Sequence, residues 1–537
     1  MRFTIKISGP AGAGIMQAGE TLSKALNRLG FFTLVYPEYP SRIRGGDNHI
    51  QIIFSSQEAL SPQQKIDLLL ALSPAHLQAH AAELAKNETG FESEKIGLKE
   101  IARSLANPLV ENTAGLGFLW AVLGFELGVL KSQLKKDFAS KKNILNLNLR
   151  AAQKGYEKGK SQKIDLKLRP LAGREIVNLT GNEALTQGIL AAQCRFAAIY
   201  PMTPINAILT LLAKTKVTLF RPEDEIAGIT AAIGASYAGK RALVATSGGG
   251  FSLMVEALGM AGITETPIVI VVGQRTGPST GIATYSSQAD LNFVIHAGHG
   301  EFPRIVLAPG DLEESSRLGT EAFNLAERYQ VPVILLTDKY LAESRFAILE
   351  KDWQKIKVPL DRGKLYQGTG REDYERYQLT TDGVSPRAFP GQTVFLTNSY
   401  EHDEHGFSTD EALIRGKMMA KRGKKLESLT NGFEEYGEIE GEKVLVGWGS
   451  TKGILRDFVR ENPGWGLLHF WRLWPFPKGV KEVLAKAKKV VVVEGNFSGQ
   501  LAGLIEAETG LKTKKILKDN GRPFFKEELE EKLNKIK

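Results

Sequence analysis

Short runs of β-branched and aliphatic residues alternate with longer amphipathic stretches along most of this chain. Near its start, an apolar run at 3–7, an amphipathic stretch at 15–29 and a second apolar run at 32–36 predict a strand, a helix and a strand. A glycine-rich turn at 9–14 connects the first strand to the helix. This order is typical of the βαβ unit that opens an α/β domain.

The same alternation is clearest in the middle of the chain and returns at its end. Predicted strands lie at 196–200, 242–246, 267–272, 304–307 and 331–337, with helices at 205–213, 224–238, 253–262 and 312–329. Further strands are predicted at 443–448, 467–470 and 489–494, with helices at 452–460, 478–487 and 500–509. Strands separated by helices predict parallel sheets that are covered on both faces.

Changes in composition divide the chain into four regions: 1–170, 171–345, 346–440 and 441–537. The third region is rich in Gly, Pro and charged residues, and its one clear helical pattern is at 409–426. A long irregular segment is uncommon inside one domain, so we expect a connecting arm that wraps a neighbour. The predicted fold class is α/β, with three consecutive α/β domains and mainly parallel sheets.

Composition excludes several classes of protein. The chain has 537 residues, 42% hydrophobic and 24% charged, which excludes disorder or a coiled coil as a description of the whole. A single cysteine, Cys194, excludes an internal disulfide, a Cys-ligated iron–sulfur cluster and a Cys-type zinc site within the chain. The longest mostly apolar stretch, 118–130, contains Glu126 and falls short of the roughly 20 residues of a membrane span. We expect a cytoplasmic protein with no membrane partner.

The net charge of +9 comes from one stretch. Residues 131–169 contain twelve Lys and Arg against three acidic residues. Few aromatic side chains lie between the lysines, which argues against base stacking, so we interpret the stretch as a solvated face and linker and expect no nucleic-acid partner.

The glycine-rich turn at 9–14 has the spacing G-x-x-G-x-G and lacks the Lys-Ser/Thr of a P-loop. It is either a tight strand–helix connection or an anion site, since backbone N–H groups before a helix can hold a phosphate. Arg42 and Arg44, beside a double glycine just after the second strand, favour an anionic ligand at the same end of the sheet.

Four strand-end loops of the second region carry polar or glycine residues. The segment 200–204 holds the Thr203 hydroxyl between two prolines, and Glu225 begins an Ala- and Gly-rich helix. A carboxyl there either caps the helix or, if buried, exchanges a proton. Segment 246–250 has three glycines that allow a ligand to approach the backbone, and Arg275 in 273–281 is suited to a carboxylate. Loops at the carboxyl ends of parallel strands form binding sites.

Other candidates are weaker. The segment 402–405 contains metal-ligand residue types but lies in the irregular arm, so no metal site is expected on the chain. Ser247 and Ser279 lack the context of a hydrolase nucleophile.

Together, the motifs resemble the α subunit of the 2-oxoacid:ferredoxin oxidoreductases, in the form where a γ domain is fused ahead of α. Segments at 9–14, 36–47, 112–113 and 151–156 resemble the γ domain. Those at 200–204, 223–227, 246–250 and 273–281 resemble the thiamine-pyrimidine domain, and those at 447–452, 474–477 and 494–500 the transketolase C-terminal-like domain. The resemblance implies that these domains occupy 1–170, 171–345 and 441–537, joined by the arm at 346–440.

The resemblance also implies roles for residues. Glu225 would face N1′ of the thiamine aminopyrimidine, with Glu223 as its nearby rival, while Thr203 and Arg275 would bind the keto and carboxylate groups of a 2-oxoacid. The implied contacts are Tyr200, Pro201, Ser247 and Gly248 to thiamine diphosphate, and Gly9, Gly12, Gly14, Arg42 and Arg44 to coenzyme A.

The implied reaction is oxidative decarboxylation of a 2-oxoacid to acyl-CoA and CO2, with ferredoxin as electron acceptor. The chain has no evident G-D-G…N motif for Mg²⁺ and diphosphate, so thiamine diphosphate would be shared with a β subunit that carries Mg²⁺ and a [4Fe–4S] cluster. Met202 and Gly249 depart from the family's usual residues, which leaves the oxoacid open, with 2-oxoglutarate favoured. One alternative is a non-catalytic scaffold of the same fold. Another is a nicotinamide dehydrogenase, which the absence of a G-x-G-x-x-G loop disfavours.

Overall fold

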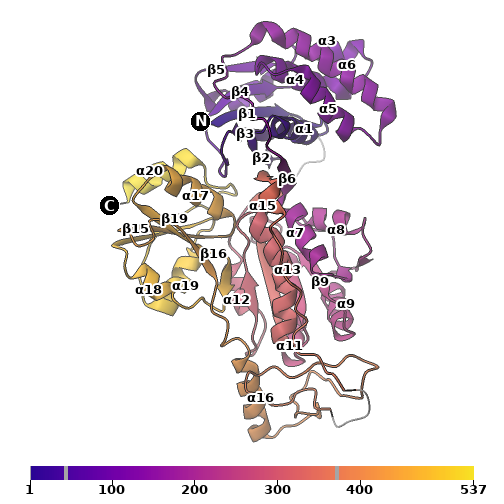
Figure 1. Cartoon of the computed structure of the whole chain (residues 1–537), viewed down its shortest axis with the longest axis vertical. Coiled ribbons are helices and arrows are strands. Elements are labelled where there is room, and N and C mark those ends of the chain that lie inside the picture. The colour runs from indigo at the N-terminus through magenta and orange to yellow at the C-terminus, as the bar shows by residue number, and fades with distance from the viewer. Residues whose placement is uncertain (1, 41–45, 369–373, 537) are drawn as a thin grey trace. The chain divides into compact units, whose positions relative to one another are not determined.

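The predicted apolar runs form the central strands of three sheets (Figure 1). A computed structural model of the chain describes residues 2–40, 46–368 and 374–536. These form two compact units: the first comprises described residues within 1–180, 343–355 and 524–537, and the second those within 181–342 and 356–523. The α/β class with mainly parallel sheets is confirmed.

The first unit is built on a mixed sheet with the strand order β5-β4-β1-β3-β2-β13-β6. Its strands are β1 (Arg2–Gly9), β2 (Phe32–Glu38), β3 (Asn48–Ser55), β4 (Ile66–Ala71), β5 (Leu84–Glu92), β6 (Ile176–Thr180) and β13 (Arg345–Leu349). The predicted strand–helix–strand opening is present, but β3 lies between β1 and β2 and pairs antiparallel with both. β1 is parallel to β4.

Helices of the first unit bury their apolar faces against this sheet and against one another. They are α1 (Ile15–Arg28), α2 (Pro74–His80), α3 (Leu98–Ser104), α4 (Glu111–Val122), α5 (Leu127–Asp137), α6 (Lys142–Gly159), α15 (Glu350–Trp353) and α20 (Lys526–Lys535). α4 and α6 can pack closely because Gly155 has no side chain. A Cβ at that position would lie only 1.9 Å from the Ala114 carbonyl oxygen. The lysine-rich stretch forms α5 and α6, and most of its lysines are exposed.

The second unit contains the other two sheets. The larger has the order β17-β11-β12-β10-β9-β7-β8 and is parallel except where β17 joins β11. Its strands are β7 (Phe196–Ala198), β8 (Thr218–Phe220), β9 (Ala242–Thr246), β10 (Ile268–Gln274), β11 (Ile305–Leu307), β12 (Pro332–Asp338) and β17 (Arg472–Trp474). The smaller, β14-β16-β15-β18-β19, comprises β14 (Phe433–Gly437), β15 (Lys443–Trp448), β16 (Trp465–Phe470), β18 (Lys489–Glu494) and β19 (Lys514–Leu517).

Helices cover both of these sheets. Those around the larger sheet are α7 (Gly181–Ala191), α8 (Asn206–Leu212), α9 (Glu225–Tyr237), α10 (Gly248–Phe251), α11 (Val255–Ile263), α12 (Leu291–His296), α13 (Leu312–Tyr329) and α14 (Lys339–Glu343). The smaller sheet carries α17 (Lys452–Glu461), α18 (Val480–Leu484) and α19 (Gln500–Thr509). One hydrophobic core runs through both sheets and includes Val244 and Ile270 from one and Val446 and Leu468 from the other.

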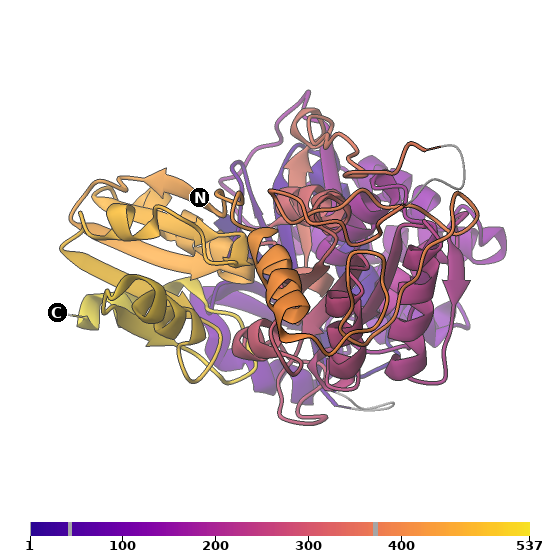
Figure 2. The same ribbon diagram turned by 90° about the horizontal axis from the view of Figure 1, so that it is seen from below.

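The region interpreted as a connecting arm has two parts. Its first residues form β13, which pairs with β2 and β6 of the first sheet, a strand that the pattern did not indicate. The short helix α15 follows β13, and the described residues from there to α16 (Ala412–Lys424) are irregular. α16 matches the helix predicted at 409–426 (Figure 2).

Within the second unit, a buried ion-pair cluster ties α16 to the segment that follows α11. The Nζ atoms of Lys421 and Lys425 lie 2.6 and 2.7 Å from the Glu265 carboxylate, and all three side chains are at most 1% exposed. Burial alone would raise the pKa of Glu265, but the two ammonium groups outweigh it and hold that pKa well below its usual range. Arg376 also donates to the Glu265 carbonyl oxygen over 2.9 Å.

We expect the substitution Glu265→Gln to destabilise the chain by about 3–5 kcal/mol, since it leaves two buried ammonium groups without their counter-charge. The midpoint of urea unfolding measures the effect. The matched control is Glu440→Gln, which removes an exposed pair with Lys486 and should leave the midpoint unchanged. Equal midpoints for the two variants would contradict a stabilising role of the cluster.

Candidate active site

Loops after three neighbouring parallel strands meet at one edge of the larger sheet. β7, β9 and β10 are adjacent in the strand order, and each ends just before or within the first two residues of one of the predicted site segments. A cavity of about 510 Å³ opens there, and its lining includes Met202, Ser247, Gly248, Arg275, Asp290 and Phe293. The structure thus places three of the four predicted loops around one cavity.

Glu225 provides a buried carboxylate at this edge. It is 4% exposed and is the first residue of α9, whereas Glu223 is exposed. The capping role that such an acid often has is taken by Asp224, which accepts a 2.9 Å hydrogen bond from the Ala227 N–H. The carboxylate of Glu225 is therefore not used as the helix cap.

The surroundings of Glu225 require a glycine at position 250. The Thr246 hydroxyl donates to Glu225 Oε1 over 3.4 Å. A Cβ on Gly250 would lie 2.4 Å from the same oxygen and 2.1 Å from Thr246 Oγ1, so any side chain there would displace the carboxylate. The glycines of this loop therefore bring the start of α10 close to the start of α9.

Ser247 leaves a buried polar atom unsatisfied. Its side chain is 1% exposed, and its Oγ has no hydrogen-bond partner among the described residues. It also makes no capping hydrogen bond, although it precedes α10. A buried hydroxyl without a partner costs stability unless a ligand supplies one, so this atom points to a bound polar group at the cavity wall.

Arg275 connects two of the loops. Its Nη1 donates to the Thr203 carbonyl oxygen over 3.1 Å, and burial lowers the pKa of Arg275 without removing its charge at neutral pH. Tyr200 and Pro201 are exposed beside this contact, and Met202 reaches Thr246 Oγ1 with its sulfur at 3.9 Å. The 200–204 segment therefore lies close to both Arg275 and the Glu225 side of the site.

Sequence reasoning missed Asp290, which lines the same cavity. It precedes α12 and resembles an ordinary helix cap, yet it makes no capping hydrogen bond. Burial raises the pKa of Asp290 to about 6, against the opposing effect of the Arg275 guanidinium. A Cβ on Gly248 would lie 2.5 Å from Asp290 Oδ2, so this glycine is also required by packing.

The predicted coenzyme A residues lie in the first unit. Gly12 and Gly14 have φ of 87° and 73°, a backbone conformation that favours glycine. Asn112 closes the turn by donating to the carbonyl oxygens of Ala13 and Gly14. Gly9 ends β1, and Arg42 and Arg44 lie outside the described residues.

Comparison with known proteins gives consistent matches. Residues 187–421 match the family described as pyruvate flavodoxin/ferredoxin oxidoreductase, thiamine diphosphate-binding, and residues 4–158 match the family described as pyruvate ferredoxin/flavodoxin oxidoreductase. The 2-oxoacid:ferredoxin oxidoreductase subunit alpha of a Sulfolobus species is 34% identical, over 100% of this chain and 97% of that protein. These matches confirm the family resemblance drawn from the motifs.

Two further relatives carry a more specific substrate in their names. The 2-oxoglutarate oxidoreductase subunit KorA of Mycobacterium tuberculosis is 28% identical, over 98% of this chain and 90% of that protein. The structure of 2-oxoglutarate:ferredoxin oxidoreductase from Magnetococcus marinus, with 2-oxoglutarate, coenzyme A and succinyl-CoA bound, aligns with a TM-score of 0.91 and 31% identity over 99% of both chains.

Among the helices of the described residues, none has the length and hydropathy that a membrane span requires.

The raised pKa of Asp290 predicts a pH-dependent contribution to stability. Because the folded chain holds this proton more tightly than the unfolded chain, the contribution is full at acidic pH and is lost as the pH rises through about 6. Between about pH 5 and pH 7.5, we expect the free energy of unfolding of Asp290→Asn to rise by about 1 kcal/mol relative to that of the parent chain.

Urea unfolding at both pH values measures this gain, and the exposed Asp519→Asn is the control for the loss of one carboxyl group. The same pH-dependent difference in both variants would contradict the assignment to Asp290.

Proposed function

The chain belongs to the α subunits of the 2-oxoacid:ferredoxin oxidoreductases, and from this premise we propose that, with a β subunit, it converts a 2-oxoacid and coenzyme A to acyl-CoA and CO2 while reducing ferredoxin. We favour 2-oxoglutarate as the oxoacid because the names of the M. tuberculosis relative and the M. marinus structure both specify it. The observation that carries the proposal is the buried carboxylate of Glu225, which accepts a hydrogen bond from Thr246, the residue before the Ser247–Gly249 wall of the cavity that Arg275 also lines.

The residues at the cavity fit thiamine diphosphate, the cofactor class of this family. The unsatisfied Ser247 hydroxyl can hydrogen-bond to it, and the backbone at Gly248 and Gly249 allows close approach. Exposed Tyr200 and Pro201 lie on the neighbouring loop. When bound, thiamine diphosphate supplies the carbon nucleophile for a 2-oxoacid carbonyl and accepts the electron pair left when CO2 departs.

In this proposal Glu225 holds a proton at N1′ of the aminopyrimidine ring. A carboxylate that is almost excluded from water interacts strongly with one ring nitrogen, because little solvent screens the contact. The Thr246 hydroxyl fixes one oxygen, Oε1, and Gly250 leaves room for the carboxylate. Glu225 is therefore suited to position and exchange that proton.

Arg275 and Thr203 are assigned to the oxoacid. The guanidinium lines the cavity and can pair with the substrate carboxylate through two parallel hydrogen bonds. Its contact with the Thr203 carbonyl oxygen keeps the 200–204 segment beside it, and on this basis we assign the Thr203 hydroxyl to the adjacent keto group.

The assignment of coenzyme A to the first unit rests on Gly9, Gly12 and Gly14 together with Arg42 and Arg44. A turn with two left-handed glycines presents backbone N–H groups, and these can bind the phosphates of coenzyme A.

A β subunit is required because this chain supplies part of the chemistry. One cysteine cannot ligate a [4Fe–4S] cluster, so the cluster and Mg²⁺ are assigned to the partner. Large apolar side chains are exposed on the strand-end loops and the start of α9, and we assign this surface to the β subunit: Tyr200, Phe220, Ile226, Leu253 and Ile282. A group of exposed apolar residues on a soluble domain indicates a protein interface.

We expect Glu225→Gln to lower turnover of the assembled complex by about 10²–10⁴-fold, because the amide cannot exchange the proton. The assay is oxoacid-dependent reduction of a viologen dye with coenzyme A, run over a panel of oxoacids. Glu223→Gln, two residues away and exposed, is the control and should retain full activity. Near-normal turnover of the Glu225 variant would instead favour the non-catalytic scaffold.

Ile226→Asp should weaken association with the β subunit by about tenfold or more, because it places a charge in an apolar interface. Ile226 is 51% exposed, so the substitution should not disturb the fold. Co-purification with a tagged β subunit measures the loss. Leu413→Asp, at a 70% exposed position on α16, is the control, and equal co-purification of both variants would place the interface elsewhere.

A further inference from the structure

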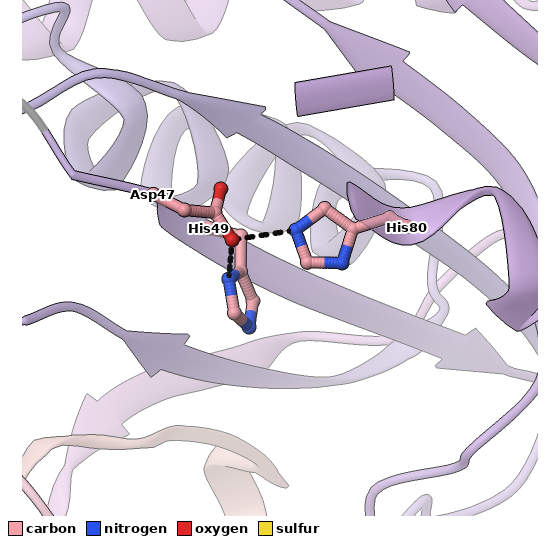
Figure 3. Close-up of side chains that lie close together, drawn as sticks. All are labelled: Asp47, His49 and His80. Atoms are coloured by element: carbon pink, nitrogen blue, oxygen red, sulfur yellow. Dashed lines mark hydrogen bonds and ion pairs between the residues drawn. The ribbon is translucent and has the colours of Figure 1, made fainter. Parts of the chain in front are cut away.

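Two histidines and an aspartate come together in the first unit (Figure 3). Asp47 directly precedes β3, His49 lies on β3, and His80 is the last residue of α2. Asp47 Oδ2 lies 2.9 Å from His80 Nε2 and 3.2 Å from His49 Nδ1. Each of the three residues offers one metal-ligand atom, and these three atoms all lie within 4.8 Å of one another.

The outer nitrogens of both imidazoles face carboxylates. His80 Nδ1 lies 2.5 Å from Glu83 Oε1, and His49 Nε2 lies 3.7 Å from Glu38 Oε2. Histidines that bind metals commonly turn their second nitrogen to a carboxylate, which fixes the tautomer and the ring orientation. One hydrogen bond from Asp47 would suffice to anchor a structural histidine, so the repetition of this pattern on both rings needs a further explanation.

Neighbouring groups hold the cluster in place and make it acidic. The Ser8 hydroxyl donates to Asp47 Oδ1 over 2.6 Å, and the Tyr36 hydroxyl donates to Glu38 over 3.1 Å. Three carboxylates, those of Glu38, Asp47 and Glu83, surround the two imidazoles, and Lys6 forms an ion pair with Glu83. This excess of negative charge favours a bound cation.

The cluster is also accessible from one side. The His80 side chain is 5% exposed and that of His49 12%, while the Asp47 side chain is 35% exposed. A metal ion could enter past Asp47 while the imidazoles remain oriented by their buried contacts.

We propose that Asp47, His49 and His80 form a binding site for a divalent transition-metal ion of the zinc type. Imidazole nitrogens and a carboxylate oxygen are ligands that zinc takes at about 2.0–2.2 Å, which separates tetrahedral ligand atoms by about 3.3 Å. The contacts of 2.9 and 3.2 Å are close to that separation, so small side-chain shifts would admit the ion. Three protein ligands leave a fourth position for water or an anionic group.

The site has a defined place in the fold, independent of the proposed function. Ser8 pairs with His49 across β1 and β3, one residue before the register of Gly9 with Asn48. The ion would therefore join the start of β3 to the end of α2, while Ser8 near the end of β1 holds Asp47 beside the beginning of the 9–14 turn.

The test is calorimetric titration of the full chain with ZnCl2 after treatment with a chelator. We expect one zinc equivalent to bind to the parent chain, an affinity loss of about 100-fold or more in Asp47→Asn and His80→Gln, and a loss of about 10–100-fold in Glu83→Gln. His76→Gln is the matched control: His76 lies on the same helix α2, hydrogen-bonds to Ser73 and is outside the cluster. It should bind zinc like the parent chain.

A second measurement uses the parent chain alone, so it remains informative if a variant folds poorly. X-ray absorption at the zinc edge of the loaded parent chain should give two imidazoles and an oxygen ligand. Sulfur ligation, the absence of stoichiometric binding, or unchanged binding by Asp47→Asn would overturn the proposal. Because neither measurement uses turnover, failure of the metal-site proposal is distinguishable from failure of the proposed function.

Discussion

The arrangement of the candidate active site depends on keeping one carboxylate buried at the start of α9. Three local features make this possible. Asp224 takes the capping position, Thr246 donates to Glu225 Oε1, and Gly250 has no side chain where one would collide with that oxygen. The parallel order of β7, β9 and β10 then brings the remaining loops to the same edge. A side chain at position 250 would collide both with this carboxylate and with the Thr246 hydroxyl at the end of β9.

Buried charge in the second unit divides into two kinds. Glu265 with its two lysines is one paired cluster, and Glu314 is another: Lys452 Nζ lies 2.5 Å from its carboxylate and His469 Nε2 lies 3.1 Å away. Lys452 and His469 come from elements of the smaller sheet's domain, so this pairing fixes that domain against α13. Asp290 makes no comparable ion pair among the described residues, and burial raises its pKa to about 6. The carboxylate at the cavity is thus less compensated than Glu265 and Glu314, which hold elements of the fold together.

The sequence was most informative where chemistry is local. The strand at 242–246, the helix at 312–329 and the loops after the strands follow from short-range patterns, and Glu225 follows from its place beside them. Asp290 was missed because an acid before a helix has an ordinary capping explanation. Asp47 and His80 are 33 residues apart and meet only because β3 inserts between β1 and β2, a pairing that no local pattern specifies. β13 was missed for the same reason, since its partners β2 and β6 lie far away in sequence.

If the active site is shared with a β subunit, as proposed, two features of this chain have a common explanation. The buried Ser247 hydroxyl has no hydrogen-bond partner among the described residues, which costs stability, and large apolar side chains are exposed on the same loops. Under the proposed function, cofactor and β subunit satisfy both at once: the cofactor supplies the missing hydrogen bond, and the partner covers the apolar surface. Glu225 is protected from water by its own chain, so it needs no partner to remain buried. In the proposed enzyme the carboxylate of Glu225 would therefore be in place before assembly, while cofactor binding and the exclusion of water from the cavity would depend on the second subunit.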